Sequence, residues 1–309
     1  MIRTSRQLKA LVRNVSRGDS AKAQIIIRNY VMERFLERLS LSQYKSNIIL
    51  KGGTLVAAIV GLDNRSTLDV DATLKNLPLN EEKARKMVED IISVPVDDGM
   101  IFEIKNVVPI IDEADYFGIR IMLETTLENM RTPLKIDFST GDVITPREVS
   151  YSFRLLFEER TISILAYNLE TVLAEKIETL LVRGTANTRM RDFYDIYVLI
   201  NTQARNIDNV TLKNAFANTS GKRGSFALLA DADLIVNEIS ESERMIGLWQ
   251  SYQRKFDYAA EVQWGDVIES IKYLVRVLLS EPISKRIASP SKSCFSACVK
   301  CVKQKALSI

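Results

Sequence analysis

The apolar residues of this chain change their spacing near Asn168, and this change constrains the fold more than any other sequence feature. Downstream, they recur at helical spacing over residues 168–183, 188–201, 208–219, 225–256 and 264–280. Upstream, helical stretches are mixed with stretches of alternating apolar and polar residues. There we predict helices at 4–17, 20–40, 54–60 and 81–94, and strands at 47–51, 66–73, 101–108, 117–125, 133–138 and 150–153. This order is typical of an α+β half followed by an all-helical half.

The chain has 309 residues, which suits two units of about 150 residues each. We expect N-terminal helices over residues 1–45, an α+β core over 46–160, a helical domain over 161–280 and a tail over 281–309. Ser20 is the expected N-cap of the second helix. The tail is basic and holds all three cysteines, Cys294, Cys298 and Cys301. Because it lacks apolar periodicity, we expect it to be disordered.

Composition excludes several classes of protein. With 46% hydrophobic and 26% charged residues, the chain has the composition of a globular protein. No apolar run is long enough to cross a bilayer, and the N-terminus lacks the apolar region of a secretory signal. We therefore expect a cytoplasmic protein that does not contact a membrane.

Histidine is absent, which excludes Ser-His-Asp triads, Cys-His pairs and zinc sites that need imidazole. Any chemistry must use carboxylates, lysines, hydroxyls or a bound metal. Residues 1–28 carry seven Lys/Arg and one acid, and residues 282–309 carry six Lys/Arg and none. Two basic ends flanking an acidic body permit contact with a polyanion.

A glycine pair marks the first candidate site. Gly52, Gly53 and Thr54 follow a predicted strand and begin a predicted helix, so free N–H groups of the helix start are available to an anion. Asp69 and Asp71 follow in the next predicted strand, where their spacing places both carboxylates on one face. Hard cations such as Mg²⁺ prefer such oxygen ligands.

A third carboxylate, Asp137, lies on the polar side of another predicted strand, beside Lys135. Three strand-borne aspartates behind a glycine turn suit phosphoryl transfer assisted by two metal ions, in which one activates a hydroxyl and the other neutralises a triphosphate. The alternative is three unrelated aspartates exposed on ordinary antiparallel strands.

The helical half contains a second cluster. Lys176 falls within the apolar stripe of its predicted helix, and a buried ammonium group requires an anionic partner. Asp192 and Asp195 lie one turn apart on the following helix. Lys176 either binds a ligand phosphate and is oriented by one of these aspartates, or forms a purely structural ion pair with one of them.

These residues resemble the motifs of the AbiEii/AbiGii nucleotidyltransferase toxin family. Lys51-Gly52-Gly53-Thr54-Leu55, followed by Arg65-x-Thr67-x-Asp69-Val70-Asp71, is similar to its first motif. Leu173-Ala174-Glu175-Lys176 is similar to its lysine motif, and Arg191-Asp192-x-Tyr194-Asp195 to its last aspartate motif. The resemblance covers roughly residues 4–280, with the motifs in the expected order.

The resemblance implies a polymerase-beta-like nucleotidyltransferase core followed by a helical C-terminal domain, in the toxin of an abortive-infection toxin–antitoxin pair for phage defence. It implies Mg²⁺ or Mn²⁺ as cofactor, a nucleoside triphosphate (NTP) as substrate, RNA (the tRNA 3′ end in particular) as acceptor, and an AbiEi-like antitoxin as partner.

The implied roles fall into three groups. Catalysis is implied for Asp69, Asp71, Lys176, Asp192 or Asp195, and Asp137; metal binding for Asp69, Asp71 and Asp137; nucleotide binding for Gly52, Gly53, Thr54, Arg65, Thr67 and Lys176. Two rival functions remain open. One is a protein-modifying nucleotidyltransferase, and the other is a degenerate regulator that binds nucleotides without transferring them.

Overall fold

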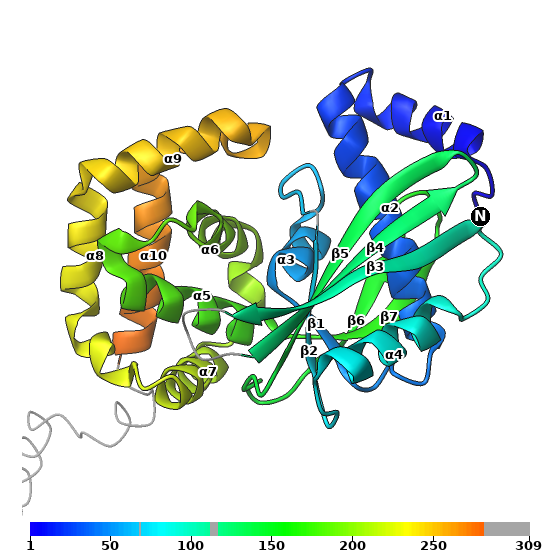
Figure 1. Cartoon of the computed structure of the whole chain (residues 1–309). Helices are drawn as coiled ribbons and strands as arrows, with labels where there is room; N and C mark the ends of the chain where they lie inside the picture. The colour runs from blue at the N-terminus through cyan, green and yellow to red at the C-terminus, as the bar shows by residue number, and fades with distance from the viewer. Residues whose placement is uncertain (68, 112–116, 281–309) are drawn as a thin grey trace, which may run out of the picture.

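The computed structural model describes residues 1–67, 69–111 and 117–280 (Figure 1). The expected tail and its three cysteines therefore lie outside the described residues. A seven-stranded sheet with the order β3-β4-β5-β2-β1-β7-β6 forms the centre of the N-terminal half. Its strands are β1 (Ile48–Lys51), β2 (Asp69–Leu74), β3 (Met100–Ile111), β4 (Phe117–Leu127), β5 (Met130–Thr140), β6 (Val149–Arg154) and β7 (Thr161–Ala166).

The pairing of β2 determines the geometry of the centre of the sheet. It runs antiparallel to β1 and parallel to β5, whereas β3, β4 and β5 form an antiparallel meander. Val70 and Ala72 of β2 and Ile136 of β5 are fully buried on one face. The alternating residues of the same strands are therefore presented on the opposite face.

Four helices belong to this half: α1 (Ser5–Ser16), α2 (Ser20–Leu41), α3 (Gly52–Val60) and α4 (Glu81–Ile92). Helices α2 and α4 contact each other and the sheet, and α3 packs on β1 and β2. Their apolar faces supply much of the core, with Leu36, Leu55 and Val88 fully buried.

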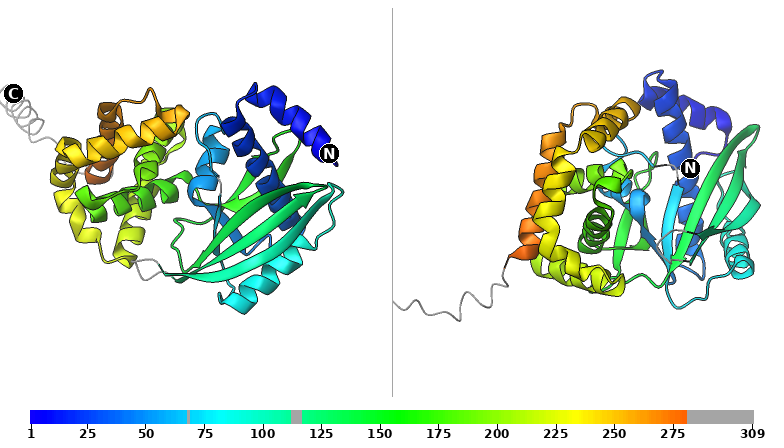
Figure 2. Two further views of the ribbon diagram at one scale, coloured as in Figure 1. Left: turned by 45° about the horizontal axis from the view of Figure 1, so that its top comes forward. Right: turned by 60° about the vertical axis from the view of Figure 1, so that its left-hand side comes forward.

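The C-terminal half is helical: α5 (Leu169–Arg183), α6 (Met190–Gln203), α7 (Asn209–Lys222), α8 (Ala232–Glu241), α9 (Glu243–Lys255) and α10 (Trp264–Leu279). Helix α10 contacts α6, α7 and α8, and its Ile271 and Leu274 are fully buried. Figure 2 shows in both views that α8, α9 and α10 (yellow to orange) lie on the far side of α3 from the meander. The order of an α+β half and an all-helical half is confirmed.

Three local expectations need correction. Asp19, not Ser20, caps α2, because its carboxylate accepts hydrogen bonds from the backbone N–H groups of Ala21 and Lys22. The predicted helix over 225–256 is divided, because Ser242 has extended backbone and its hydroxyl caps the new helix α9. Residues 161–166, which we expected to begin the helical domain, form β7 of the sheet.

Helix α2 also buries charged side chains, among them Glu33, Arg34 and Glu37. Glu33 is 3% exposed and accepts a hydrogen bond from the Leu156 N–H. Burial raises the pKa of Glu33 to about 8, against the lowering effect of that hydrogen bond and of Arg34. The ionised form of Glu33 is therefore disfavoured in the folded protein.

This raised pKa predicts a pH-dependent contribution to stability. Because the folded pKa lies above the ordinary value of 4.5, the contribution is fully present below pH 4.5 and is lost as pH rises through about 8. Glu33→Gln keeps a neutral hydrogen-bond acceptor. Urea unfolding should show a gain over wild type on the order of 3 kcal/mol at pH 9 and little change at pH 4.5. The exposed Glu159→Gln is the control, and equal effects of Glu33→Gln at both pH values would refute the assignment.

Candidate active site

Strand β1 passes directly into helix α3 at Gly52, without an intervening loop. Gly52 has a φ of +61°, and a Cβ there would lie 2.5 Å from Oδ2 of Asp71. A Cβ at Gly53 would lie 2.9 Å from an Arg65 nitrogen, and the Gly53 N–H donates to Asp71 Oδ2 at 3.2 Å. The glycine pair is thus required for the close approach of the helix start to Asp71.

This close approach predicts the effect of Gly52→Ala. Both Gly52→Ala and Gly61→Ala introduce a side chain at positive φ, but nothing lies within 4 Å of the Cβ position at Gly61. Gly61→Ala therefore controls for backbone strain alone. Gly52→Ala should also displace Asp71 and reduce transfer by about 100-fold relative to Gly61→Ala. Equal rates for the two variants would show that the spacing between Gly52 and Asp71 is unimportant.

Three aspartates share the face of the sheet next to this helix start. In the β2–β5 register, Asp71 lies opposite Asp137 and Asp69 opposite Lys135, while Lys51 of β1 lies opposite Asp71. Burial and, after it, the nearby carboxylates of Asp137 and Asp69 together raise the pKa of Asp71 to about 6, against the lowering effects of Lys51 and of the Gly53 N–H. The face therefore concentrates negative charge that a cation would stabilise.

Two cations of the meander neutralise part of this charge. Lys135 Nζ lies 2.6 Å from Asp69 Oδ2. Arg120 of β4 donates two hydrogen bonds to Asp137, each 2.8 Å long. Among the described residues, no three of the His, Cys, Asp and Glu side chains are arranged to hold a metal ion. Asp69 and Asp137 instead have ion-pair partners.

The residue types still fit a divalent cation. Three carboxylates lie on one face, and burial together with electrostatic repulsion from Asp137 and Asp69 raises the pKa of Asp71. Hard cations take carboxylate oxygens and relieve such repulsion. Binding would require Lys135 and Arg120 to release Asp69 and Asp137.

The two predicted hydroxyl ligands contact β2 in the structure. Thr54 is fully buried. Its hydroxyl donates a hydrogen bond to the Asp69 carbonyl and accepts one from the Asp71 N–H. Thr67 is 5% exposed and its hydroxyl also faces the Asp69 carbonyl. In this conformation the Thr54 hydroxyl ties α3 to the start of β2, and the Thr67 hydroxyl makes a local bond within the segment that enters β2.

A second cluster joins the α3–β2 loop to the helical half. Arg65 Nε donates to Asp195 Oδ1 at 2.6 Å, and Lys176 Nζ lies 2.8 Å from Asp195 Oδ2 and 2.7 Å from Asp192 Oδ1. Burial alone would raise the pKa of Asp195, but Lys176 and Arg65 hold it below its ordinary value. Lys176 therefore pairs with both aspartates, where we expected one or the other.

Lys51 directly precedes the glycine pair, but the sequence alone assigns it no role. Its Nζ lies 2.5 Å from Asp142 Oδ2, and Glu175 and Asp142 together raise its pKa despite burial. Its position directly before Gly52 is the sequence feature that could have marked it as a site residue. Arg120 and Asp142 carried no local signal, because their partners are distant in sequence.

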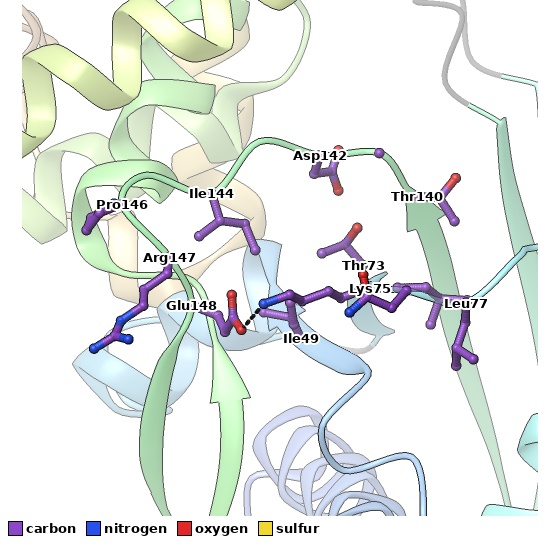
Figure 3. Close-up of a pocket in the computed structure, with 13 residues that line it drawn as sticks. Ile49, Thr73, Lys75, Leu77, Thr140, Asp142, Ile144, Pro146, Arg147 and Glu148 are labelled. Atoms are coloured by element: carbon purple, nitrogen blue, oxygen red, sulfur yellow. Dashed lines mark hydrogen bonds and ion pairs between the residues drawn. The ribbon is translucent and has the colours of Figure 1, made fainter.

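A cavity of about 600 Å³ adjoins this face at the end of β2 (Figure 3). Thr73 lies on its wall and shares the face of Asp71, two residues earlier, while Asp142 links the cavity wall to Lys51. Lys75 and Glu148 both line the cavity and form an ion pair, which Figure 3 shows. Asp69, Asp71 and Asp137 are not among the residues that line the cavity.

The site residues form two linked groups. Gly52, Gly53, Asp69, Asp71 and Asp137 surround the start of α3, whereas Arg65, Lys176, Asp192 and Asp195 form the buried ionic cluster. Arg65 connects the groups, because it lies against Gly53 and bonds to Asp195.

Residues 34–270 match the family model described as nucleotidyl transferase AbiEii toxin, type IV TA system. The chain belongs to the AbiEii nucleotidyltransferase toxin family. Its fold is accordingly a polymerase-beta-like nucleotidyltransferase core followed by an all-helical C-terminal domain. No curated protein matches the chain.

Two solved structures from Helicobacter pylori match this chain. JHP933 superimposes with a TM-score of 0.50 at 14% identity, covering 82% of this chain and 91% of JHP933. A second protein, proposed to be a nucleotidyltransferase, gives a TM-score of 0.45 at 16% identity, covering 84% of this chain and 99% of its own. Among the described residues, no helix is long and apolar enough to cross a membrane.

Proposed function

We propose that this AbiEii family member transfers a nucleotide from an NTP to a hydroxyl of RNA, at the tRNA 3′ end in particular, and thereby blocks translation. The observation that carries this proposal is the register of β2 and β5, which places Asp69, Asp71 and Asp137 on one face beside the α3 start. That arrangement suits phosphoryl transfer, in which positioning and charge stabilisation dominate catalysis.

Each group of residues has a proposed part in the reaction. The Gly53 N–H, the α3 start and Lys51 bind the triphosphate, because they supply positive charge beside Asp71. Asp69, Asp71 and Asp137 would hold Mg²⁺ or Mn²⁺, which, when bound, lowers the pKa of the attacking hydroxyl and neutralises phosphate charge. The acceptor hydroxyl loses its proton to solvent and its oxygen bonds to the α-phosphorus. The bond from that phosphorus to the oxygen bridging to the β-phosphate breaks, and pyrophosphate leaves with that oxygen.

Lys176 is proposed to contribute a phosphate contact, oriented by Asp192 and Asp195. The pair of carboxylates holds its ammonium group in a buried position. Arg65, bonded to Asp195 and packed on Gly53, fixes this cluster relative to the triphosphate site.

The proposed biological role is that of a cytoplasmic toxin in abortive infection and phage defence. The toxin–antitoxin family implies an antitoxin partner, which we propose to be AbiEi-like and encoded beside the toxin. Co-expression of the neighbouring upstream reading frame should restore growth of cells that express this chain. Continued arrest despite a soluble co-expressed product would contradict the pairing.

The acceptor is tested by supplying each class of molecule separately. Purified chain, Mg²⁺ and each labelled NTP are incubated with tRNA, with RNA depleted of tRNA, and with RNA-free protein. We expect label in tRNA alone, removed by nuclease digestion. Label retained by protein would support the protein-modifying alternative, and nucleotide binding without transfer would support the degenerate regulator.

A further inference from the structure

Helix α1 carries three cations on one side, and its C-cap residue Arg17 adds a fourth directly beyond the helix. Arg6, Lys9, Arg13 and Arg17 are all exposed and recur at intervals of three or four residues. At about 100° per residue, Arg6, Lys9 and Arg13 fall within an arc of about 60°, adjacent to the side on which Leu8 and Val12 are buried. We call these four residues the α1 cation stripe.

The stripe lacks the anionic partners that other exposed helices of this protein have. On α4, Arg85 and Lys86 each have an acid four residues later, Glu89 and Asp90. Helix α1 contains no acid at all. Within the part of the chain that the structure describes, Arg6, Arg13 and Arg17 form no ion pair.

Acids around α1 have other partners. Asp19, two residues after Arg17, accepts hydrogen bonds from the backbone N–H groups of Ala21 and Lys22. Asp97 pairs with Arg3, and Asp63 pairs with Lys22 at 2.8 Å. Glu128 accepts hydrogen bonds from the N–H and the hydroxyl of Ser5. These hydrogen bonds lower the pKa of Glu128 more than the charge of Lys9 does. The positive charge of the stripe is therefore largely uncompensated by the protein.

Contacts of α1 and α2 connect the stripe to two segments of the chain that lead to the aspartate face. The N-terminal end of α1 bonds to Glu128, in the turn between β4 and β5, and β5 carries Asp137. Beyond the other end, Lys22 pairs with Asp63 and Asn29 donates to the Thr67 carbonyl, both in the loop that leads to Asp69. Figure 2 shows α1 (dark blue) beside the tip of the meander.

We propose that the α1 cation stripe binds phosphates of the acceptor RNA and positions its 3′ end at the aspartate face. This rests on the proposed transfer to RNA. From Arg6 to Arg17 the helix extends about 16 Å, several times the axial spacing of about 3.4 Å per nucleotide in a duplex strand. The stripe precedes residues 34–270 of the family match, so it is a feature of this chain outside the matched region.

The test compares two triple variants of the full chain. Arg6→Gln/Lys9→Gln/Arg13→Gln removes three stripe cations, and Lys83→Gln/Arg85→Gln/Lys86→Gln removes the same charge from exposed positions of α4. Glutamine has a helix propensity similar to that of lysine and arginine. Binding of bulk tRNA is measured at several salt concentrations, and melting temperatures confirm folding.

We expect the stripe variant to reduce the slope of log K against log salt by about 2 to 3, one contact per lost cation. At 0.1 M salt, the stripe variant should bind tRNA more weakly than wild type does. The α4 variant should keep the wild-type slope within one unit. Equal slopes for the stripe variant and wild type would overturn the inference, whether or not RNA is the acceptor. Stripe-dependent tRNA binding by a wild-type protein that transfers nothing to RNA would instead refute the proposed function.

Discussion

Replacing Asp71 with asparagine is expected to abolish nucleotidyl transfer and growth arrest while leaving the protein folded. The amide oxygen of the new side chain can still accept the Gly53 N–H bond, and removal of a carboxylate whose pKa is raised by burial should not destabilise the fold. Transfer should fall by at least about 1,000-fold, because charge stabilisation at the phosphates supplies most of the catalysis. Transfer rates and thermal melting of the purified variant provide the measurement.

A matched control distinguishes loss of this carboxylate from loss of negative charge in general. Asp63→Asn removes an exposed aspartate from the neighbouring loop and should leave transfer near wild type. Asp69→Asn should behave like Asp71→Asn. A soluble Asp69→Asn/Asp71→Asn double variant that still transfers nucleotides or arrests growth would contradict the metal-assisted mechanism.

Lys176→Met should both destabilise the protein and abolish transfer. The substitution keeps the bulk of the side-chain stem but leaves Asp192 without its Lys176 partner and Asp195 with Arg65 alone. Breaking a buried ion pair from one side costs on the order of 3 kcal/mol. Urea unfolding and transfer assays measure the two effects separately.

A double variant separates the structural role of Lys176 from its proposed phosphate contact. Lys176→Met/Asp192→Asn removes both charges, so it should recover part of the lost stability, while Asp195 keeps Arg65. If Lys176 binds phosphate, the double variant remains inactive and NTP with Mg²⁺ no longer raises its melting temperature. Recovery of both stability and transfer would show that Lys176 has a structural role only.

The sequence predicted those parts of the site that depend on local spacing. Asp69 and Asp71 share a face because they are two residues apart in a strand, and the glycine pair directly follows β1 and begins α3. The alternation of Ile162, Ile164 and Ala166 was also visible, but β7 is short and directly precedes a long helical region. Its assignment depended on pairing with β1 and β6.

The remaining features depend on contacts between distant segments. Arg120 reaches Asp137 because β4 and β5 pair in a register fixed by their turn. The double pairing of Lys176 requires α5 and α6 to pack side by side, and Lys51 meets Asp142 only after β5 lies in the sheet. Local periodicity contains none of this information.

The central claim is that the aspartate face catalyses nucleotidyl transfer, and the fate of the individual phosphates tests it most directly. Wild-type protein with Mg²⁺ and RNA is supplied in parallel with NTP labelled at the α- or the γ-phosphate. We predict that the α-label enters RNA and that the γ-label appears in an equal amount of pyrophosphate, with neither product formed by Asp71→Asn. Entry of the γ-label into the acceptor, or turnover without pyrophosphate, would contradict this claim.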